Sequence, residues 1–315
     1  MSTAKKQAGA VRVPRRGRRR LTAIEKKELP VVYLMLAPAI LLLTVFVVVP
    51  LFIALERSFY DWTFYKPSTF VGWDSYRIII NNYFFRQSVK NAFKFVIIIV
   101  PLMMIIAFAL SHLIRSLGPR MSNVYKGIIY IPTVVSGIAA SVIFIFVLDF
   151  RGGIINQTLL ALGGERIAFM TSSAWATTAV SGVTLWLGFG INTILMYAAL
   201  TSIPTEYYEA ASIDGASGFQ KMYHVTIPQM KNIFVLIAVQ LTTGTLQMFD
   251  IPYLLTGGGP RNQTLTPMLY LYNNYRDANK GMGYTIAGAL IMMVLITAIN
   301  SIIFRVIRSE KMVDG

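Results

Sequence analysis

Long apolar runs alternate with short polar segments along this 315-residue chain. A helix needs about 20 predominantly apolar residues to cross a bilayer, and six runs meet this length. They lie at about 31–55, 91–114, 124–148, 174–200, 232–255 and 284–307. The pattern predicts an all-α membrane protein with six transmembrane helices. An even number of spans places both termini on the same side.

The segment between the first two runs, 57–90, mixes tryptophan and tyrosine with charged residues. These aromatic residues favour the boundary between lipid and water, so we expect an outer segment with pieces that lie along the interface. The segment is too short for a soluble core of its own. The first apolar run is too long for a cleavable signal peptide and is interpreted as a span.

Composition agrees with a membrane protein, because only 14% of the residues are charged and 55% are hydrophobic, whereas soluble domains carry about 25% charged residues. The net charge is +15, and ten of the 29 basic residues lie in the first thirty positions. A basic tail could bind nucleic acid. Next to a span, the simpler interpretation is a cytoplasmic tail that faces anionic membrane lipid, and no nucleic-acid partner is expected.

Lysine and arginine are enriched in cytoplasmic loops. With the N-terminus inside, eighteen basic residues fall in inner segments and ten in outer ones. Both termini are therefore expected in the cytoplasm. The predicted organisation is a basic tail at 1–30, a six-span membrane domain at 31–307 with a cytoplasmic loop at 201–230, and a C-terminal tail at 308–315.

The chain lacks the parts of most catalytic sites. It has no cysteine, and its two histidines, His112 and His224, have no companions for a metal site or a Ser-His hydrolase. Gly257–Gly259 is followed by proline, not by the lysine of a phosphate-binding loop. We predict no catalytic residue, metal or cofactor, and the chain is not expected to be an enzyme.

The longest polar segment between the later runs surrounds a short predicted helix. Pro204 suits the first turn of a helix, and Gly215 suits its end. Tyr207, Ala210, Ala211 and Asp214 share one face at spacings of three and four, and the two alanines let another surface approach closely. From spacing alone, a solvated loop between two membrane helices is the alternative.

The residue types in this segment are more specific than their spacing. Its characteristic residues are Glu209-Ala210-Ala211, then Asp214-Gly215-Ala216, then Val225-Thr226-Ile227-Pro228. They resemble the EAA loop of bacterial ABC-importer permeases, in which E-A-A-x-x-D-G-A is followed downstream by I-x-L-P. The stretches Trp186-Leu187-Gly188-Phe189 and Leu254–Pro260 resemble the carbohydrate-uptake branch of that family, the maltose and glycerol-phosphate importer type.

The resemblance implies a type I ABC importer permease fold in the cytoplasmic (inner) membrane. It implies four kinds of partner: a second permease subunit in a heterodimer, a cytoplasmic ATPase dimer, an extracellular or periplasmic sugar-binding protein, and a carbohydrate substrate. ATP hydrolysis is then expected on the ATPase. The residues implied in coupling to it are Glu209, Ala210, Ala211, Asp214 and Gly215.

Polar residues inside spans are costly and often functional, and the fourth and fifth runs carry most of them. The resemblance places the substrate path on these two runs. The residues expected to line it are Gly188, Asn192, Thr242, Thr245, Met248 and Phe249. Thr242, Thr245 and Phe249 are taken to share one helix face. Hydrogen bonding and close packing between helices are the alternative role for each.

Three other functions remain open at this point. A polyol or glycerol-phosphate cargo would keep the same family. An ion-coupled secondary transporter should carry a carboxylate deep in a span, and none is evident. A membrane-embedded enzyme would need a nucleophile, a base and an orienting group, and no such set is visible.

Overall fold

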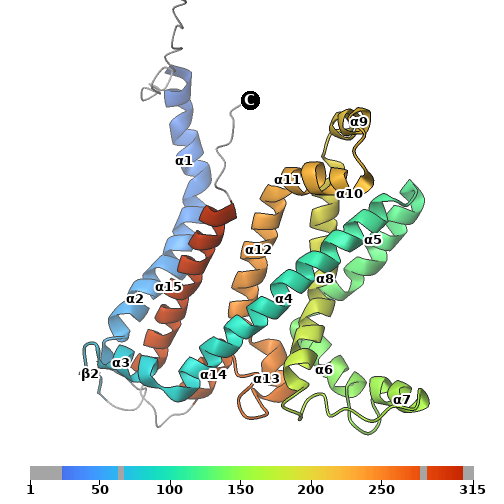
Figure 1. Ribbon diagram of the computed structural model, residues 1–315. Helices are drawn as coiled ribbons and strands as arrows, with labels where there is room; N and C mark the ends of the chain where they lie inside the picture. Colours follow the sequence, from blue (N-terminus) through green and yellow to red (C-terminus); the bar gives the residue numbers. More distant parts are fainter. Residues whose placement is uncertain (1–22, 63–66, 277–281, 308–315) are drawn as a thin grey trace, which may run out of the picture. The chain divides into compact units, whose positions relative to one another are not determined.

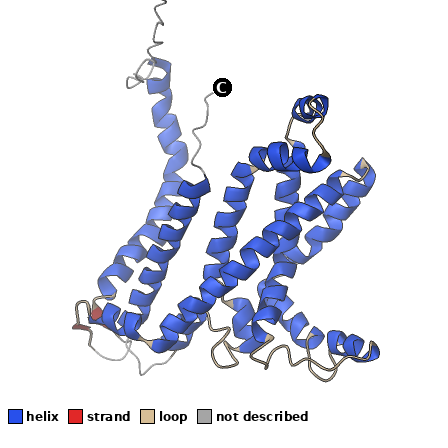
Figure 2. Cartoon of the chain, in the orientation of Figure 1, coloured by secondary structure: helices blue, strands red, loops and turns tan. Residues whose placement is uncertain are grey.

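The computed structural model describes residues 23–62, 67–276 and 282–307, with side chains described from Pro30 onward. The predicted tails at 1–30 and 308–315 therefore fall outside the described residues, except for the start of the first helix. The described chain is almost entirely helical (Figure 2).

The chain divides into two units, Met1–Ala54 and Leu55–Gly315. The first unit contains one long apolar helix, made of α1 (Ala23–Leu43), the π-helical turn η1 (Thr44–Val48) and most of α2 (Val49–Arg57). Its stretch from Pro30 is long and apolar enough to cross a membrane, and none of its described side chains is buried within the protein. This matches the first predicted span.

The second unit contains the remaining elements, labelled in Figure 1. They are β1 (Tyr60–Asp61), β2 (Thr69–Phe70), α3 (Asp74–Asn81), α4 (Tyr83–Arg115), α5 (Pro119–Val134), α6 (Gly137–Val147), α7 (Ile154–Ala161), α8 (Ala176–Thr201), α9 (Thr205–Ile213), α10 (Gly218–Lys221), η2 (Met222–Thr226, a π-helical turn), α11 (Ile227–Gln229), α12 (Lys231–Leu246), α13 (Asp250–Thr256), α14 (Pro267–Tyr275) and α15 (Met282–Ile307). The two short strands pair antiparallel.

Among the described residues, four helices are long and apolar enough to span a membrane, and two bent helix pairs bring the number to as many as six. In the second unit, the unbroken ones are α4, α8 and α15. The pair α5–α6 bends by 94°, and the segment Gly218–Gln229 bends by 66° against α12. The six predicted runs are thus matched by up to six helical segments, two of them bent. The fifth of these segments covers 218–246, whereas the predicted run was 232–255.

The prediction of a continuous third span at 124–148 was wrong. The helix stops at Val134, and Val135 and Ser136 adopt extended backbone conformations. The Ser136 side chain accepts a hydrogen bond from Ala139 N and so caps a new helix, α6. Hydropathy could not detect this break because the flanking residues are apolar on both sides.

The prediction of a continuous fifth span at 232–255 was also wrong. Helix α12 ends at Leu246, and α13 begins at Asp250. Pro252 has no backbone N–H to donate to the Met248 carbonyl, as a continuous helix would require. The Thr266 hydroxyl donates to this carbonyl instead, at 2.7 Å.

The second span begins earlier than predicted. Asn82 caps α4 by accepting hydrogen bonds from Phe84 N and Phe85 N, so α4 is 33 residues long. Its first two turns carry charged and polar residues, which hid the helix from a hydropathy pattern. Asn91, on this polar stretch, is buried and donates from Nδ2 to the Asn262 and Leu265 carbonyls at 2.6 and 2.9 Å. It holds the loop that follows Gly257–Gly259 against α4.

Helices α4 and α8 pack along one another, and α5 and α12 join them. Gly190 of α8 lies against α5 so closely that an added Cβ would overlap the backbone carbonyl oxygen of Ile129. Gly182, on the same helix, has open space around its Cα. Small residues let membrane helices approach in this way.

Replacing Gly190 by alanine should therefore lower stability, because the Ile129 backbone has to move. Overpacking of this kind costs about 1–3 kcal/mol. Gly182→Ala should leave stability equal or raise it, because alanine favours a helix by about 0.5–1 kcal/mol over glycine. The measurement is the midpoint of thermal unfolding in mild detergent. Equal midpoints for the two variants would show that α5 and α8 are not in tight contact at Gly190.

Candidate substrate cavity and coupling loop

A cavity of about 470 Å³ lies where α8, α12 and the α12–α13 break meet. Helices α4 and α6 complete its wall. Its lining residues are Ile99, Met103, Gly137, Thr184, Leu187, Gly188, Ile191, Asn192, Gln240, Leu241, Gly244, Thr245, Gln247, Met248, Phe249, Asp250 and Ile251. The wall combines apolar surface with amide, hydroxyl and carboxylate groups.

Five of the six side chains expected on a substrate path line this cavity: Gly188, Asn192, Thr245, Met248 and Phe249. Thr242 does not, although it is buried. In α12 the lining residues are Gln240, Leu241, Gly244 and Thr245. Thr242 lies about 130° around the helix from the middle of the face that they form. Phe249 reaches the cavity from the break after α12, so the argument from a shared helix face does not explain its position.

Asn192 has a distinctive environment. Its side chain is 1% exposed, and Nδ2 donates to the Gly188 carbonyl at 2.8 Å. Its Oδ1 has no hydrogen-bond partner. A buried acceptor without a partner is unfavourable by about 1–3 kcal/mol. Asn192 lines the cavity, but Oδ1 itself is covered by protein atoms, so a donor from a ligand reaches this acceptor only when neighbouring side chains move.

Two contacts shape the rest of the wall. The Thr184 hydroxyl donates to the Val180 carbonyl at 2.8 Å and lies 3.4 Å from Met248 Sδ, which connects α8 to the break after α12. A Cβ on Gly188 would lie 2.5 Å from Met103 Cε. Glycine at this position lets the methionine of α4 reach the cavity.

Gln240, Gln247 and Asp250 also line the cavity, although the sequence analysis did not place them on the substrate path. It missed Ile99, Met103 and Gly137 altogether. These three lie in apolar runs with no distinguishing pattern. Only the packing of α4 and α6 against α8 and α13 brings them to the cavity.

The coupling loop, residues 201–230, lies at the end of this unit opposite to α13 (Figure 1). Helix α9 begins after Pro204 and ends before Gly215, whose φ of +76° is in the left-handed region that favours glycine. Of the predicted coupling residues, Glu209, Ala210, Asp214 and Gly215 are exposed, and Ala211 is half-buried. The predicted helix and its end are thus both present.

The second half of the loop is held by polar contacts. Ser217 and Gln220 form a capping box at the start of α10. Lys221, the last residue of α10, donates from Nζ to Ser212 Oγ at 2.7 Å and so connects α10 to α9. A hollow of about 310 Å³ between the two halves is lined by Ala211, Asp214, Gly215, Ala216, Gln220, Lys221, His224 and Val225.

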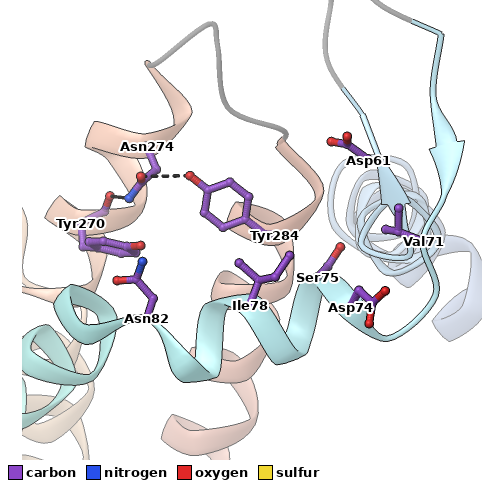
Figure 3. A pocket seen from close by; sticks show the side chains of 9 residues that line it. All are labelled: Asp61, Val71, Asp74, Ser75, Ile78, Asn82, Tyr270, Asn274 and Tyr284. Carbon is purple, nitrogen blue, oxygen red and sulfur yellow. Dashed lines mark hydrogen bonds between the residues drawn. The ribbon is translucent and has the colours of Figure 1, made fainter.

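A second large cavity, of about 520 Å³, is lined by residues of α3, α14 and α15 (Figure 3). The Tyr284 hydroxyl donates to Asn274 Oδ1 at 2.9 Å, and Asn274 Nδ2 donates to the Tyr270 carbonyl at 2.7 Å. Asp61 and Asp74 lie at the opposite end of this cavity from Tyr270 (Figure 3). None of the predicted site residues lines it.

Comparison with known families gives one decisive match. Residues 103–311 match the family described as "Binding-protein-dependent transport system inner membrane component". The chain belongs to this family. The match covers most of the second unit, including every lining residue of the cavity except Ile99 and the whole coupling loop.

Two relatives of this permease extend over nearly its whole length. The lactose transport system permease protein of Rhizobium radiobacter is 32% identical over 285 residues, which are 89% of this chain and 94% of the relative. The sulfoquinovosyl glycerol transport system permease protein of Agrobacterium fabrum is 28% identical over 93% of this chain and 99% of its own.

A solved structure confirms the fold. The crystal structure of a bacterial ABC transporter involved in the import of the acidic polysaccharide alginate matches with a TM-score of 0.78 at 21% identity. The match covers 90% of this chain and 96% of the other. The permease is thus a multi-pass membrane protein with the type I ABC importer permease fold. Membership of this family also argues against the ion-coupled transporter and the membrane-embedded enzyme.

A comparison of two buried asparagines in the permease tests the unpartnered acceptor of the cavity. Asn192→Leu should keep or raise the midpoint of thermal unfolding, because it removes a buried acceptor that has no hydrogen-bond partner. Asn91→Leu should lower the midpoint, because the Leu265 carbonyl loses its donor and the Asn262 carbonyl keeps only the longer bond from Leu265 N, at about 1–3 kcal/mol for a buried group left unpaired. Equal losses in the two variants would contradict the assignment of Asn192 as an unpartnered group.

Proposed function

We propose that the permease is one of two membrane subunits of an ATP-driven importer for an oligosaccharide or a related carbohydrate. The observation that carries the proposal is the cavity between α8 and α12, with the unpartnered Oδ1 of Asn192 in its wall. The named relatives transport lactose and sulfoquinovosyl glycerol. Both of these molecules present many hydroxyl groups.

The lining of the cavity suits a sugar. Hydroxyl groups of a sugar can bond to the Thr245 hydroxyl and the Gln240 amide, which belong to lining residues. A side-chain movement that uncovers Asn192 Oδ1 adds an acceptor for them. Phe249 supplies an aromatic ring against which a sugar ring can pack. That ring is held in place by two tyrosines. Tyr253 stacks on it with 5.2 Å between ring centres, and Tyr272 meets it edge-on with 4.9 Å between ring centres.

The coupling loop suits a cytoplasmic partner. Ile213 is 87% exposed and Phe219 is 72% exposed, and such apolar side chains at the end of a membrane protein mark a contact surface. In the proposal, an ATPase dimer covers this surface, Glu209 anchors it by a polar contact, and Ala210 and Ala211 allow a close fit. Gly215 turns the chain back toward α10.

The mechanism follows from the two sites. ATP binding favours one arrangement of the ATPases, and their movement displaces α9. A shift of α9 changes the populations of the outward-open and inward-open states of the spans. An extracellular or periplasmic binding protein delivers the carbohydrate. A second permease subunit completes the path in the cytoplasmic membrane, with both termini of this chain in the cytoplasm.

Purification of the tagged permease from its native membranes in mild detergent tests the assembly. We expect a second multi-span permease and an ATPase to co-purify, with ATP hydrolysis in the eluate. Reconstituted vesicles with the binding protein should then take up one member of a panel that contains lactose, maltose, arabinooligosaccharides and glycerol 3-phosphate. Uptake of glycerol 3-phosphate alone would show that the substrate is a polyol phosphate and not a carbohydrate. Elution alone, without ATPase activity, would overturn the proposal.

The turn at Gly215 gives a matched test of coupling. Gly215→Pro should abolish ATP-driven uptake while the permease stays in the membrane, because proline fixes φ near −65° and cannot keep the observed +76°. Gly163→Pro is the control. It has a φ of +80° with open space around it, and its N–H, like that of Gly215, donates to a carbonyl three residues earlier. Equal uptake in the two variants would show that the end of α9 is not needed for coupling.

A further inference from the structure

Helix α9 is exposed along nearly its whole length. Of its nine residues, only Tyr208 and Ala211 are half-buried, and none is buried. Tyr208 is the larger of the two, and its ring packs against the apolar cluster that contains Met196, Leu200 and Met230. The attachment of this helix to the membrane domain therefore depends on one aromatic side chain.

Tyr208 contacts the last residue of α4. The guanidinium carbon of Arg115 lies 5.0 Å from the centre of the Tyr208 ring, within the range of a cation–π interaction. Arg115 also donates from a terminal nitrogen to the Tyr208 hydroxyl at 3.3 Å. These contacts join α9 to a helix that lies far from it in sequence. Helix α4 continues to Met103 in the cavity wall, about 18 Å away along its axis.

The Tyr208 hydroxyl also contacts the segment that leads to the other wall of the cavity. It lies 2.9 Å from Thr226 Oγ1, and Thr226 is 2% exposed at the end of η2. From η2 the chain runs through α11 into α12, which contributes Gln240 and Thr245 to the cavity. One phenol group thus contacts both α4 and the segment that leads into α12.

We propose that Tyr208 is a positioning residue that transmits the movement of α9 to both walls of the substrate cavity. The ring and Arg115 carry the movement to α4, and the hydroxyl and Thr226 carry it to α12. This inference rests on the proposed function. It adds a path within the permease by which a displacement of the coupling helix reaches the cavity.

The molecule contains a matched control. Tyr197 of α8 has Lys126 Nζ 4.7 Å from its ring centre and accepts a hydrogen bond from Ser122 Oγ at 3.3 Å. It therefore makes the same two kinds of contact between helices, but it does not belong to the coupling loop. Tyr197→Ala should perturb packing as Tyr208→Ala does without interrupting the proposed path.

The experiment uses the complex purified with its partners and placed in nanodiscs. The natural permease has no cysteine, so Ile191→Cys gives this chain a single thiol in the cavity wall. Labelling of this thiol by a charged maleimide is compared between the nucleotide-free complex and the complex trapped with ATP and vanadate. The labelled chain is separated from its partners before quantification.

We expect ATP and vanadate to change the labelling in the Ile191→Cys background. Adding Tyr208→Ala should remove this change while the ATPase still co-purifies, because the exposed face of α9 is intact. Tyr208→Phe should retain part of it, because the ring stays beside Arg115 and only the hydroxyl contacts are lost. Arg115→Gln combined with Tyr208→Ala should be no worse than Tyr208→Ala alone, since both act in one contact.

A full nucleotide-dependent change with Tyr208→Ala would overturn the inference, and so would an equal loss with Tyr197→Ala. If Tyr208→Ala releases the ATPase, the Tyr208→Phe and Arg115→Gln variants test the inference in its place. A smaller nucleotide-dependent change in labelling, with the ATPase still bound, would support the inference. A change as large as in the wild type in both variants would overturn it. A wild-type complex without an ATPase would instead remove the proposed function and this inference with it.

Discussion

The hydrogen bond from the Thr266 hydroxyl to the Met248 carbonyl, at 2.7 Å, is the interaction on which the cavity depends. Within a membrane, each backbone carbonyl needs a partner from the protein. Pro252 cannot supply the partner for Met248, so α12 cannot continue into α13 without leaving that carbonyl unpaired. The hydroxyl allows the break, and the break turns Gln247, Met248 and Phe249 toward α8.

The same requirement explains the other break in the unit. Ser136 supplies a side-chain acceptor where α5 gives way to α6, and Gly137 of α6 then lies beside Asp250 at the start of α13. The two interrupted segments meet at the cavity, and the uninterrupted helices α4 and α8 support it from the other side. A permease of this family thus places its irregular backbone where the backbone borders a cavity, as membrane proteins generally do.

The coupling loop and the cavity lie at different places along the unit, yet the same helices serve both. Helix α4 ends at Arg115 beside α9 and carries Met103 in the cavity wall. Helix α12 follows the loop directly and carries Thr245. A long helix moves nearly as a rigid body, so a displacement at one end changes the shape of the cavity that the same helix lines farther along. This arrangement gives the proposed ATP-driven cycle a physical route.

The sequence by itself determined the elements whose cause is local. Apolar length predicted the spans, Pro204 and Gly215 predicted the bounds of α9, and the Glu209–Ala211 pattern indicated the family that the comparison then showed. The tertiary structure decided what depends on distant partners. The breaks after Val134 and Leu246 lie in apolar runs, and Thr266 and Ser136 act through hydrogen bonds that hydropathy does not contain. Packing between helices also determines which face of each helix borders the cavity. Met103 and Gly137 therefore line the cavity, and Thr242 does not.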